Sequence, residues 1–165
     1  VYVTLASGDP LNIPVYTISY SGSISVPQTC EIGTGDVLEI DFKEIPAYAF
    51  KQAGAGGKPV NVNKQVKTLA IQCTNIEAQA MLTLRLEAEK ASNDMMLSDN
   101  PDIGFKISDQ NDQILIPNSI NSYIPFNLLQ QPANVTIKAW PVSSTGNTPE
   151  IGPFRSRGYL RVDFE

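Results

Sequence analysis

The chain has no histidine among its 165 residues, so it lacks the side chain that most often acts as a base near neutral pH. This absence excludes catalysis by a Ser/His/Asp or Cys/His arrangement. Two carboxylates can hydrolyse glycosides without histidine, and the candidate pairs are Asp36 with Glu39 and Asp99 with Asp102. Each lies in a turn or beside a solvent-facing strand position, where a solvated carboxylate is ordinary. We therefore expect no enzymatic activity.

Positive charge and long apolar runs are also scarce. Twelve Lys and Arg stand against seventeen Asp and Glu, which gives a net charge of −5. A nucleic-acid partner is not expected, because no excess of cations is present to replace phosphate counterions. No run of eighteen apolar residues occurs, so we expect no membrane insertion. Since no charged leader precedes an apolar run at the start, we expect either a removed signal peptide or a segment of a longer protein.

Only two cysteines are present, Cys30 and Cys73, and no Cys-x-x-Cys pair or histidine accompanies them to complete a metal site. The aspartates do not follow the spacing of a calcium loop, so we expect neither a metal nor another cofactor. A single disulfide is the simplest interpretation, with two buried free thiols as the alternative. In the chain-entropy model this loop would stabilise the fold by about 4 kcal/mol. A disulfide also indicates an oxidising compartment such as a periplasm or cell surface.

The dominant hydrophobic period is two, which places alternate side chains on one face of a strand. With 42% hydrophobic residues the chain is long enough for one domain with a substantial core. The alternating apolar runs, separated by Gly/Pro/Asn/Asp clusters, are Leu38–Phe42, Leu69–Cys73, Leu82–Leu86, Ile103–Ile107, Val135–Ala139 and Leu160–Phe164. Such runs predict an all-β sandwich or barrel. Residues 75–90 have some helical composition, but their alternation favours a strand.

The first residues have a pattern of their own. One face of an extended segment would carry Tyr16, Ile18, Tyr20, Gly22, Ile24 and Val26, with Thr and Ser on the other face. An ordinary edge strand is the alternative interpretation of this segment. Residues Val1–Pro14 predict a further short strand through Val1, Val3 and Leu5, followed by a loop.

Four segments together resemble the chaperone/usher pilin family: Ser23–Phe50, Val66–Cys73 with the ending KTLAIQC, Ile103–Pro117, and Gly152–Glu165 with the sequence GPFRSRGYLRVDFE. The last carries a Gly fourteen positions from the end and a penultimate aromatic residue. The chain departs from the family where Phe164 replaces the commoner Tyr, where Lys43 replaces a frequent Gly, and in its longer start.

The resemblance implies an incomplete immunoglobulin-like β-sandwich that lacks its last strand and is completed by a donated strand. Residues 1–14 would be a linker or the tail of a preceding domain, and residues 15–165 the pilin domain, with residues 15–26 as a possible donor strand. The implied partners are a periplasmic chaperone, an usher and neighbouring subunits, on a route through the periplasm to a surface fimbria. The residues implied at the chaperone and donor-strand interface are Gly152, Leu160, Val162 and Phe164.

Two places in a fimbria are compatible with this resemblance. The chain could be the pilin domain of a tip adhesin that binds a host receptor through a separate domain. It could instead be a minor or adaptor pilin whose residues 15–26 complement the next subunit. The adhesin interpretation gives residues 1–14 a role that a simple subunit does not. A free-standing lectin, with Trp140 as its sugar platform, is a third and weaker alternative.

Overall fold

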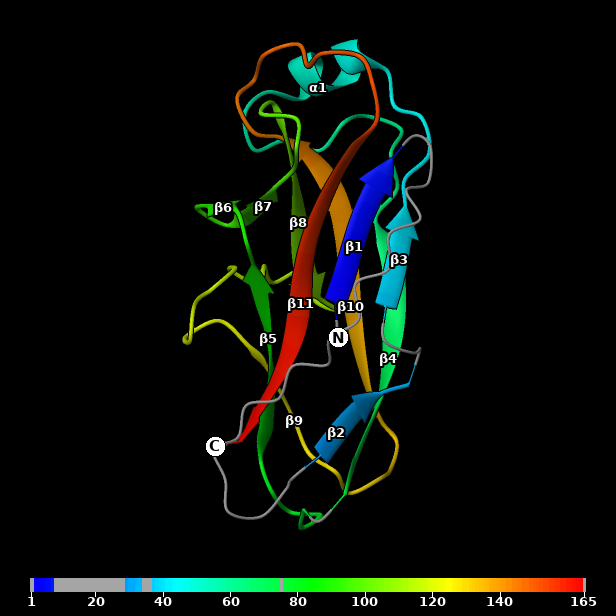
Figure 1. Cartoon of the computed structure of the whole chain (residues 1–165), viewed down its shortest axis with the longest axis vertical. Helices are drawn as coiled ribbons and strands as arrows, with labels where there is room; N and C mark the ends of the chain where they lie inside the picture. The colour runs from blue at the N-terminus through cyan, green and yellow to red at the C-terminus, as the bar shows by residue number, and fades with distance from the viewer. Residues whose placement is uncertain (1, 8–28, 34–36, 75, 165) are drawn as a thin grey trace.

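The chain folds into a β-sandwich that is capped by a short helix at one end (Figure 1). The computed structural model describes residues 2–7, 29–33, 37–74 and 76–164. Its elements are β1 (Tyr2–Ser7), β2 (Thr29–Ile32), β3 (Val37–Asp41), α1 (Ala47–Ala53), β4 (Gln65–Thr74), β5 (Leu82–Ala88), β6 (Ala91–Ser92), β7 (Met95–Leu97), β8 (Ile103–Asp109), β9 (Ile124–Phe126), β10 (Ala133–Ser143) and β11 (Phe154–Phe164).

The strands of this described part form two sheets. One has the order β3-β1-β11-β5-β9, and the other has the order β2-β4-β10-β8-β7-β6. All neighbours pair antiparallel except β1 and β3, which run parallel. Long-range pairing therefore defines the fold, since most neighbouring strands are not consecutive in the sequence.

The apolar residues that alternate along the predicted strands are the buried residues of the structure. In β11 the even-numbered residues from Phe154 to Val162 are buried and the odd-numbered ones are partly exposed. In β5 the apolar residues Leu82, Leu84 and Leu86 are buried, so the part of 75–90 that forms a regular element is a strand. Each sheet therefore contributes one apolar face to a shared core, because a strand presents alternate side chains to opposite sides.

Four phenylalanines pack together at the end of the sandwich nearest α1. The ring of Phe105 stacks on those of Phe42 and Phe154, with centroids 5.6 and 5.7 Å apart. Phe50 of α1 meets Phe154 edge to face at 5.8 Å. This cluster joins β8, β11, α1 and the segment after β3, so it closes the core at this end.

The helix α1 was not predicted from the sequence. Pro46 occupies its N-cap position in an extended conformation, and Gly54 ends it with a φ of 76°. Proline at the start and glycine just past the end are ordinary helix boundaries, because proline lacks an N–H to satisfy and glycine accepts a positive φ. Only Ala49 and Phe50 of α1 are buried, so this short helix covers the end of the core with two side chains.

The predicted disulfide is confirmed, and it links the first two strands of one sheet. Cys30 of β2 and Cys73 of β4 are directly paired in the antiparallel register and are bonded. Both are buried in the main core cluster. The alternative of two free thiols is therefore wrong, and the bond joins the edge strand β2 to β4.

Candidate functional site

The strand β1 lies between β3 and β11, which are its neighbours in space but not in sequence (Figure 1). It pairs antiparallel with β11, from Tyr2 opposite Tyr159 to Ser7 opposite Phe154. It pairs parallel with β3, from Tyr2 opposite Val37 to Ala6 opposite Asp41. We call this interval between β3 and β11 the acceptor slot, since a separate extended segment fills it and completes the sheet.

The two strands beside the acceptor slot turn apolar side chains into the core. On β3, Leu38 and Ile40 are buried, and on β11 Phe154, Leu160 and Val162 are buried in the same cluster. An empty slot would leave backbone groups of both strands without sheet partners and would expose this part of the core. Such an edge pairs readily with any extended segment of suitable pattern.

The solvent side of the slot carries opposite charges on its two borders. Glu39 and Asp41 of β3 are exposed, while Arg155 and Arg157 of β11 are partly exposed. In the observed register, Glu39 and Arg157 both lie opposite the same residue of β1, which is Thr4. A strand that enters the slot therefore runs between an acidic and a basic border.

The residues implied at the interface by the family resemblance lie in two different places. Leu160 and Val162 are buried core residues of β11, opposite Leu86 and Leu84 of β5. Phe164 is partly buried against the core at the end of β11. Gly152 is exposed and precedes the strand, which begins at Phe154.

The possible donor strand lies outside the described residues. This applies to the whole of residues 15–26, including Tyr16, Ile18, Tyr20, Gly22, Ile24 and Val26. The shorter segment predicted around Val3 and Leu5 does form a strand, which is β1. The sequence pattern marked it as a strand, but nothing local in the sequence indicated its position between β3 and β11.

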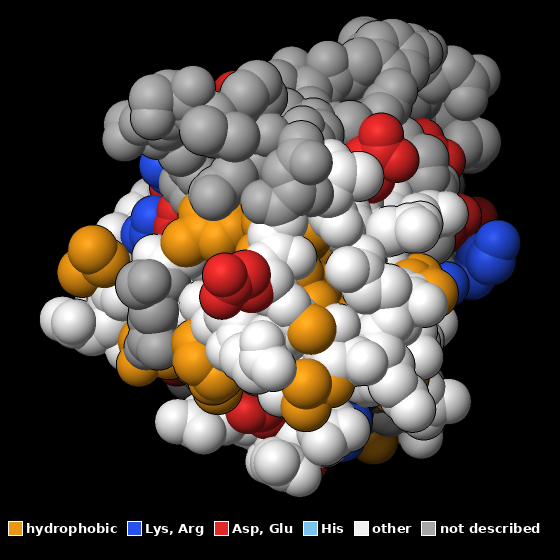
Figure 2. Space-filling model, turned by 90° about the horizontal axis from the view of Figure 1, so that it is seen from below, with side chains coloured by type: hydrophobic (Ala, Val, Ile, Leu, Met, Phe, Trp, Pro, Cys, Tyr) orange, Lys and Arg blue, Asp and Glu red, His pale blue; other side chains and the backbone are white. Residues whose placement is uncertain are grey.

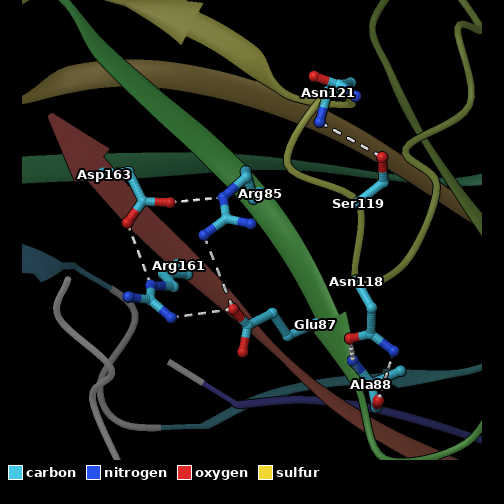
Figure 3. Close-up of polar contacts among 8 residues, drawn as sticks. All are labelled: Arg85, Glu87, Ala88, Asn118, Ser119, Asn121, Arg161 and Asp163. Atoms are coloured by element: carbon cyan, nitrogen blue, oxygen red, sulfur yellow. Dashed lines mark hydrogen bonds and ion pairs between the residues drawn. The ribbon is translucent and has the colours of Figure 1, made fainter. Parts of the chain in front are cut away.

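On the side away from the slot, four charged side chains tie β11 to β5 (Figure 3). Asp163 accepts hydrogen bonds from Arg85 and Arg161, and Arg161 also donates to Glu87 over 3.1 Å. Burial opposes the charge of Arg161, but the hydrogen bond to Glu87 and the attraction of Asp163 outweigh it and raise the pKa of Arg161. A raised pKa keeps this guanidinium charged up to and beyond its ordinary titration range. The charged Arg161 therefore links Asp163 of β11 to Glu87 of β5.

Asn118 fastens the loop before β9 to the edge of β5 (Figure 3). Its side-chain oxygen accepts a hydrogen bond from the backbone N–H of Ala88 over 2.9 Å, and its amide nitrogen donates to the backbone oxygen of Ala88 over 3.0 Å. The backbone N–H of Asn118 donates to the oxygen of Leu86. Because β9 pairs only with residues 82–84, the asparagine amide continues the pairing where that strand does not reach.

We expect Asn118→Asp to lower the free energy of unfolding by about 1–2 kcal/mol, because a carboxylate oxygen would face the Ala88 carbonyl in place of a donor. Chemical denaturation in urea measures the change. Asn118→Gly is the matched control: it tolerates the φ of 62° at this position but loses both side-chain bonds, so its loss should be smaller. Equal stability of the Asp variant and the unchanged protein would contradict this role.

Trp140 does not form an exposed platform for a sugar. It is 6% exposed and packs with Met95 and Val142 in a small cluster outside the main core. The Nζ atom of Lys64 lies 4.1 Å from the centre of its ring. Hydrogen bonds from Lys138 and then Lys64 lower the pKa of the adjacent Asp112. The tryptophan therefore packs against neighbouring side chains of its sheet, and a lysine covers its ring.

The carboxylates of the candidate pair Asp99 and Asp102 accept hydrogen bonds that hold loops together. Asp99 accepts a hydrogen bond from the backbone N–H of Arg155, and Asp102 accepts one from Thr145. Asp36 of the other pair lies outside the described residues. Within the described ranges no group of three or more acidic or cysteine side chains could hold a metal ion. Among those residues, too, no helix has the length and apolar character needed to cross a membrane.

The sequence and the fold were compared with known proteins. The model of a family described as fimbrial protein matches residues 18–165. A type 1 fimbrin D-mannose specific adhesin of Salmonella typhimurium is 56% identical over 166 residues, which cover 100% of this chain and 50% of that protein. Protein LpfD of the same organism is 39% identical over 162 residues, which cover 93% of this chain and 45% of that protein. The chain thus spans about half the length of the curated relatives it matches.

The fold is similar to that of a solved pilus protein. The crystal structure of the P pilus rod subunit PapA superposes with a TM-score of 0.63 and covers 82% of this chain and 99% of that one, at 12% identity. At this identity the likeness shows the fold alone. The predicted immunoglobulin-like sandwich of the pilin type is confirmed by it.

Proposed function

Because the chain belongs to the fimbrial protein family, we propose that its acceptor slot receives an extended strand from a neighbouring subunit and so links the two subunits in a fimbria. The observation that carries this proposal is the position of β1, a separate segment inserted between β3 and β11. Backbone hydrogen bonds to both borders would supply most of the affinity, and alternate side chains would supply the specificity.

The presence of β1 in the slot shows which kind of segment fits there. Residues 2–7 carry no charge and alternate apolar Val3 and Leu5 with Thr4 and Ala6. Val3 and Leu5 lie opposite Leu38 and Ile40, the buried residues of β3. We propose that β1 stands in for the donated strand, and that residues 1–14 form the tail of a preceding domain in the intact protein. A neighbour's segment with the same alternation would replace it during assembly.

A subunit whose slot is empty would need protection before assembly, since an exposed sheet edge beside an apolar core promotes aggregation. We propose that a strand of a periplasmic chaperone fills the slot first. At an usher, the strand of the neighbouring subunit would then replace the chaperone strand. The disulfide between Cys30 and Cys73 supports passage through an oxidising compartment. The product would be a fimbria at the cell surface.

Within the fimbria we propose that this chain is the pilin domain of a tip adhesin. The chain matches about half the length of a relative named as a D-mannose specific adhesin, which leaves room in such a protein for a separate receptor-binding domain. The burial of Trp140 disfavours a free-standing lectin that binds sugar on the sandwich itself. A minor or adaptor pilin is the second candidate, because residues 15–26 have the alternation of a donor strand.

The slot can be tested with a synthetic peptide. A chain that lacks residues 1–14 should be poorly stable, and the peptide VYVTLASG, which corresponds to residues 1–8, should restore it. At a peptide concentration 100 times its Kd, linkage predicts a rise in Tm of about 5–10 °C. Differential scanning calorimetry measures the rise.

The control peptide carries Val3→Asp and Leu5→Asp, at the two positions that pair with the buried residues Leu38 and Ile40 of β3, and it should have no effect. The proposal is wrong if the shortened chain is as stable as the full chain and neither peptide alters its Tm.

A further inference from the structure

The end of the sandwich nearest α1 contains a hollow of about 450 Å³. Its floor includes Phe50, Ile103 and Phe154, which are buried side chains of the core. Its rim is formed by the segment before α1 and by the segment Pro149–Pro153 before β11. The hollow therefore borders the four-phenylalanine cluster at Phe50 and Phe154.

One apolar side chain on this rim is almost fully exposed. Ile151 is 93% exposed, although it lines a hollow with an apolar floor. Tyr48 of α1 is also largely exposed at this end. The rim carries two exposed carboxylates, Glu44 and Glu150, and among the described residues neither forms a salt bridge. An apolar concavity flanked by two unneutralised carboxylates has the character of a docking surface.

The acceptor slot leads to this hollow. The strand in the slot runs antiparallel to β11, so its last residue, Ser7, lies opposite Phe154, the first residue of β11. Phe154 lines the hollow. In Figure 1 the arrows of β1 and β3 both point toward the end of the molecule that carries α1. Whatever follows a strand in the slot therefore emerges beside the hollow.

We propose that the hollow receives the folded domain of the same neighbouring subunit whose strand enters the slot. This inference rests on the proposed function, because a donated N-terminal strand must continue into its own domain at this end. The complementary surface on that domain would present an apolar side chain to the hollow, with a Lys or Arg positioned against Glu44 or Glu150. The link between subunits would then have two parts, a strand in the slot and a folded surface in the hollow.

The opposite end of the sandwich lacks this continuity. Leu129, in the connection between β9 and β10, is 66% exposed, but the last residue of the slot-bound strand, Ser7, lies at the Phe154 end of β11 and so leads away from it. Figure 2, seen from that end, shows hydrophobic side chains separated by neutral and acidic ones. Leu129 is therefore a matched control for Ile151, with a similar side chain at the other end of the molecule.

Photo-crosslinking in fimbriae from cells that produce the intact protein tests both parts of the link. The photoreactive residue p-benzoylphenylalanine is introduced at position 39, 151 or 129 in separate variants. Glu39 is exposed beside the slot, opposite Thr4 of β1, so a link from position 39 should reach the inserted extension of the neighbour. A link from position 151 should reach the folded domain of that same neighbour. Position 129 should give no link to that subunit.

The outcomes separate the two proposals. Links from position 39 to a neighbour's extension, with none from position 151 to its folded domain, would overturn the docking surface and leave the slot intact. If position 39 gives no link to another subunit's extension, the slot proposal itself fails.

A pair of substitutions gives a second readout. Ile151→Asp should reduce the yield of the protein in sheared fimbriae roughly tenfold, because an apolar contact on the rim of the hollow becomes a third carboxylate. Leu129→Asp should leave the yield unchanged. Both side chains are exposed, so the Tm of each variant should match that of the unchanged protein. After removal of residues 1–14, each variant should also be stabilised by the VYVTLASG peptide as much as the shortened chain without the substitution. Equal yields of the two variants would contradict the docking surface.

Discussion

Replacing Phe105 with alanine should lower the free energy of unfolding by about 3–5 kcal/mol, the largest loss that we expect from a single substitution in this chain. Phe105 is 0% exposed, and its ring lies between those of Phe42 and Phe154. Its removal would leave a void that this cluster cannot fill, because the neighbouring rings are fixed to β11 and to the segment after β3. Denaturation in urea, with the slope of the transition unchanged, measures the loss.

The effect should extend from the core to the acceptor slot. Phe42 follows β3 and Phe154 begins β11, so the rings that stack on Phe105 belong to the two borders of the slot. In the chain that lacks residues 1–14, we expect Phe105→Ala to weaken binding of the VYVTLASG peptide as well. Phe126→Ala is the control: this side chain is partly exposed on β9, so its loss of stability should be clearly smaller. Similar losses in the two variants would show that the cluster is not the centre of the core.

The second large effect is expected when the disulfide is removed. The double variant Cys30→Ala, Cys73→Ala opens a loop with a sequence separation of 43. In the chain-entropy model this change lowers the free energy of unfolding by about 4 kcal/mol, because the unfolded chain regains conformational freedom. Alanine is used because serine would bury two hydroxyl groups in the core. Equilibrium denaturation under oxidising conditions measures the loss.

Reduction supplies the internal control for this prediction. A thiol reductant should lower the stability of the unchanged protein toward that of the double variant and should leave the double variant unaffected. If the double variant were as stable as the oxidised protein, the pairing of β2 with β4 would not depend on the covalent bond.

The strands that the sequence predicted correctly are those with one buried face. In β11, period-two alternation from Leu160 to Phe164 indicated the buried side of the strand, and the structure buries Leu160 and Val162. The prediction succeeded because the pleat of a strand converts a local pattern directly into burial. Gly152 and Pro153 precede this strand, and these exposed residues line the hollow.

Other elements gave weak or misleading local signals. The helix α1 has seven residues, too few for a helical period to stand out, although Pro46 and Gly54 mark its ends. The alternating run in β10 was expected to end at Ala139, but the strand continues to Ser143. Its last residues are buried on both faces, because Trp140 and Val142 pack in the outer cluster, so alternation disappears there.

The candidate site was the least accessible to prediction, because it depends on which distant strands are adjacent. The pattern of Val3 and Leu5 predicted a strand, but its partners are residues 37–41 and 154–159. The hollow combines the segment around Ile45 with the segment around Ile151, more than a hundred positions later in the sequence. Only the three-dimensional topology brings these segments together.

A strand supplied to the acceptor slot by another molecule determines what kind of assembly such a link can build. A segment that enters antiparallel to β11 joins two unlike surfaces, an extension on one molecule and the β3–β11 interval on another. A contact between unlike surfaces is head-to-tail, so its repetition gives a ring if the rotation closes and an open helix if it does not. A symmetric pair would arise only if two molecules exchanged their extensions reciprocally. Any filament built on such contacts has two chemically different ends, and growth at one end is not equivalent to growth at the other.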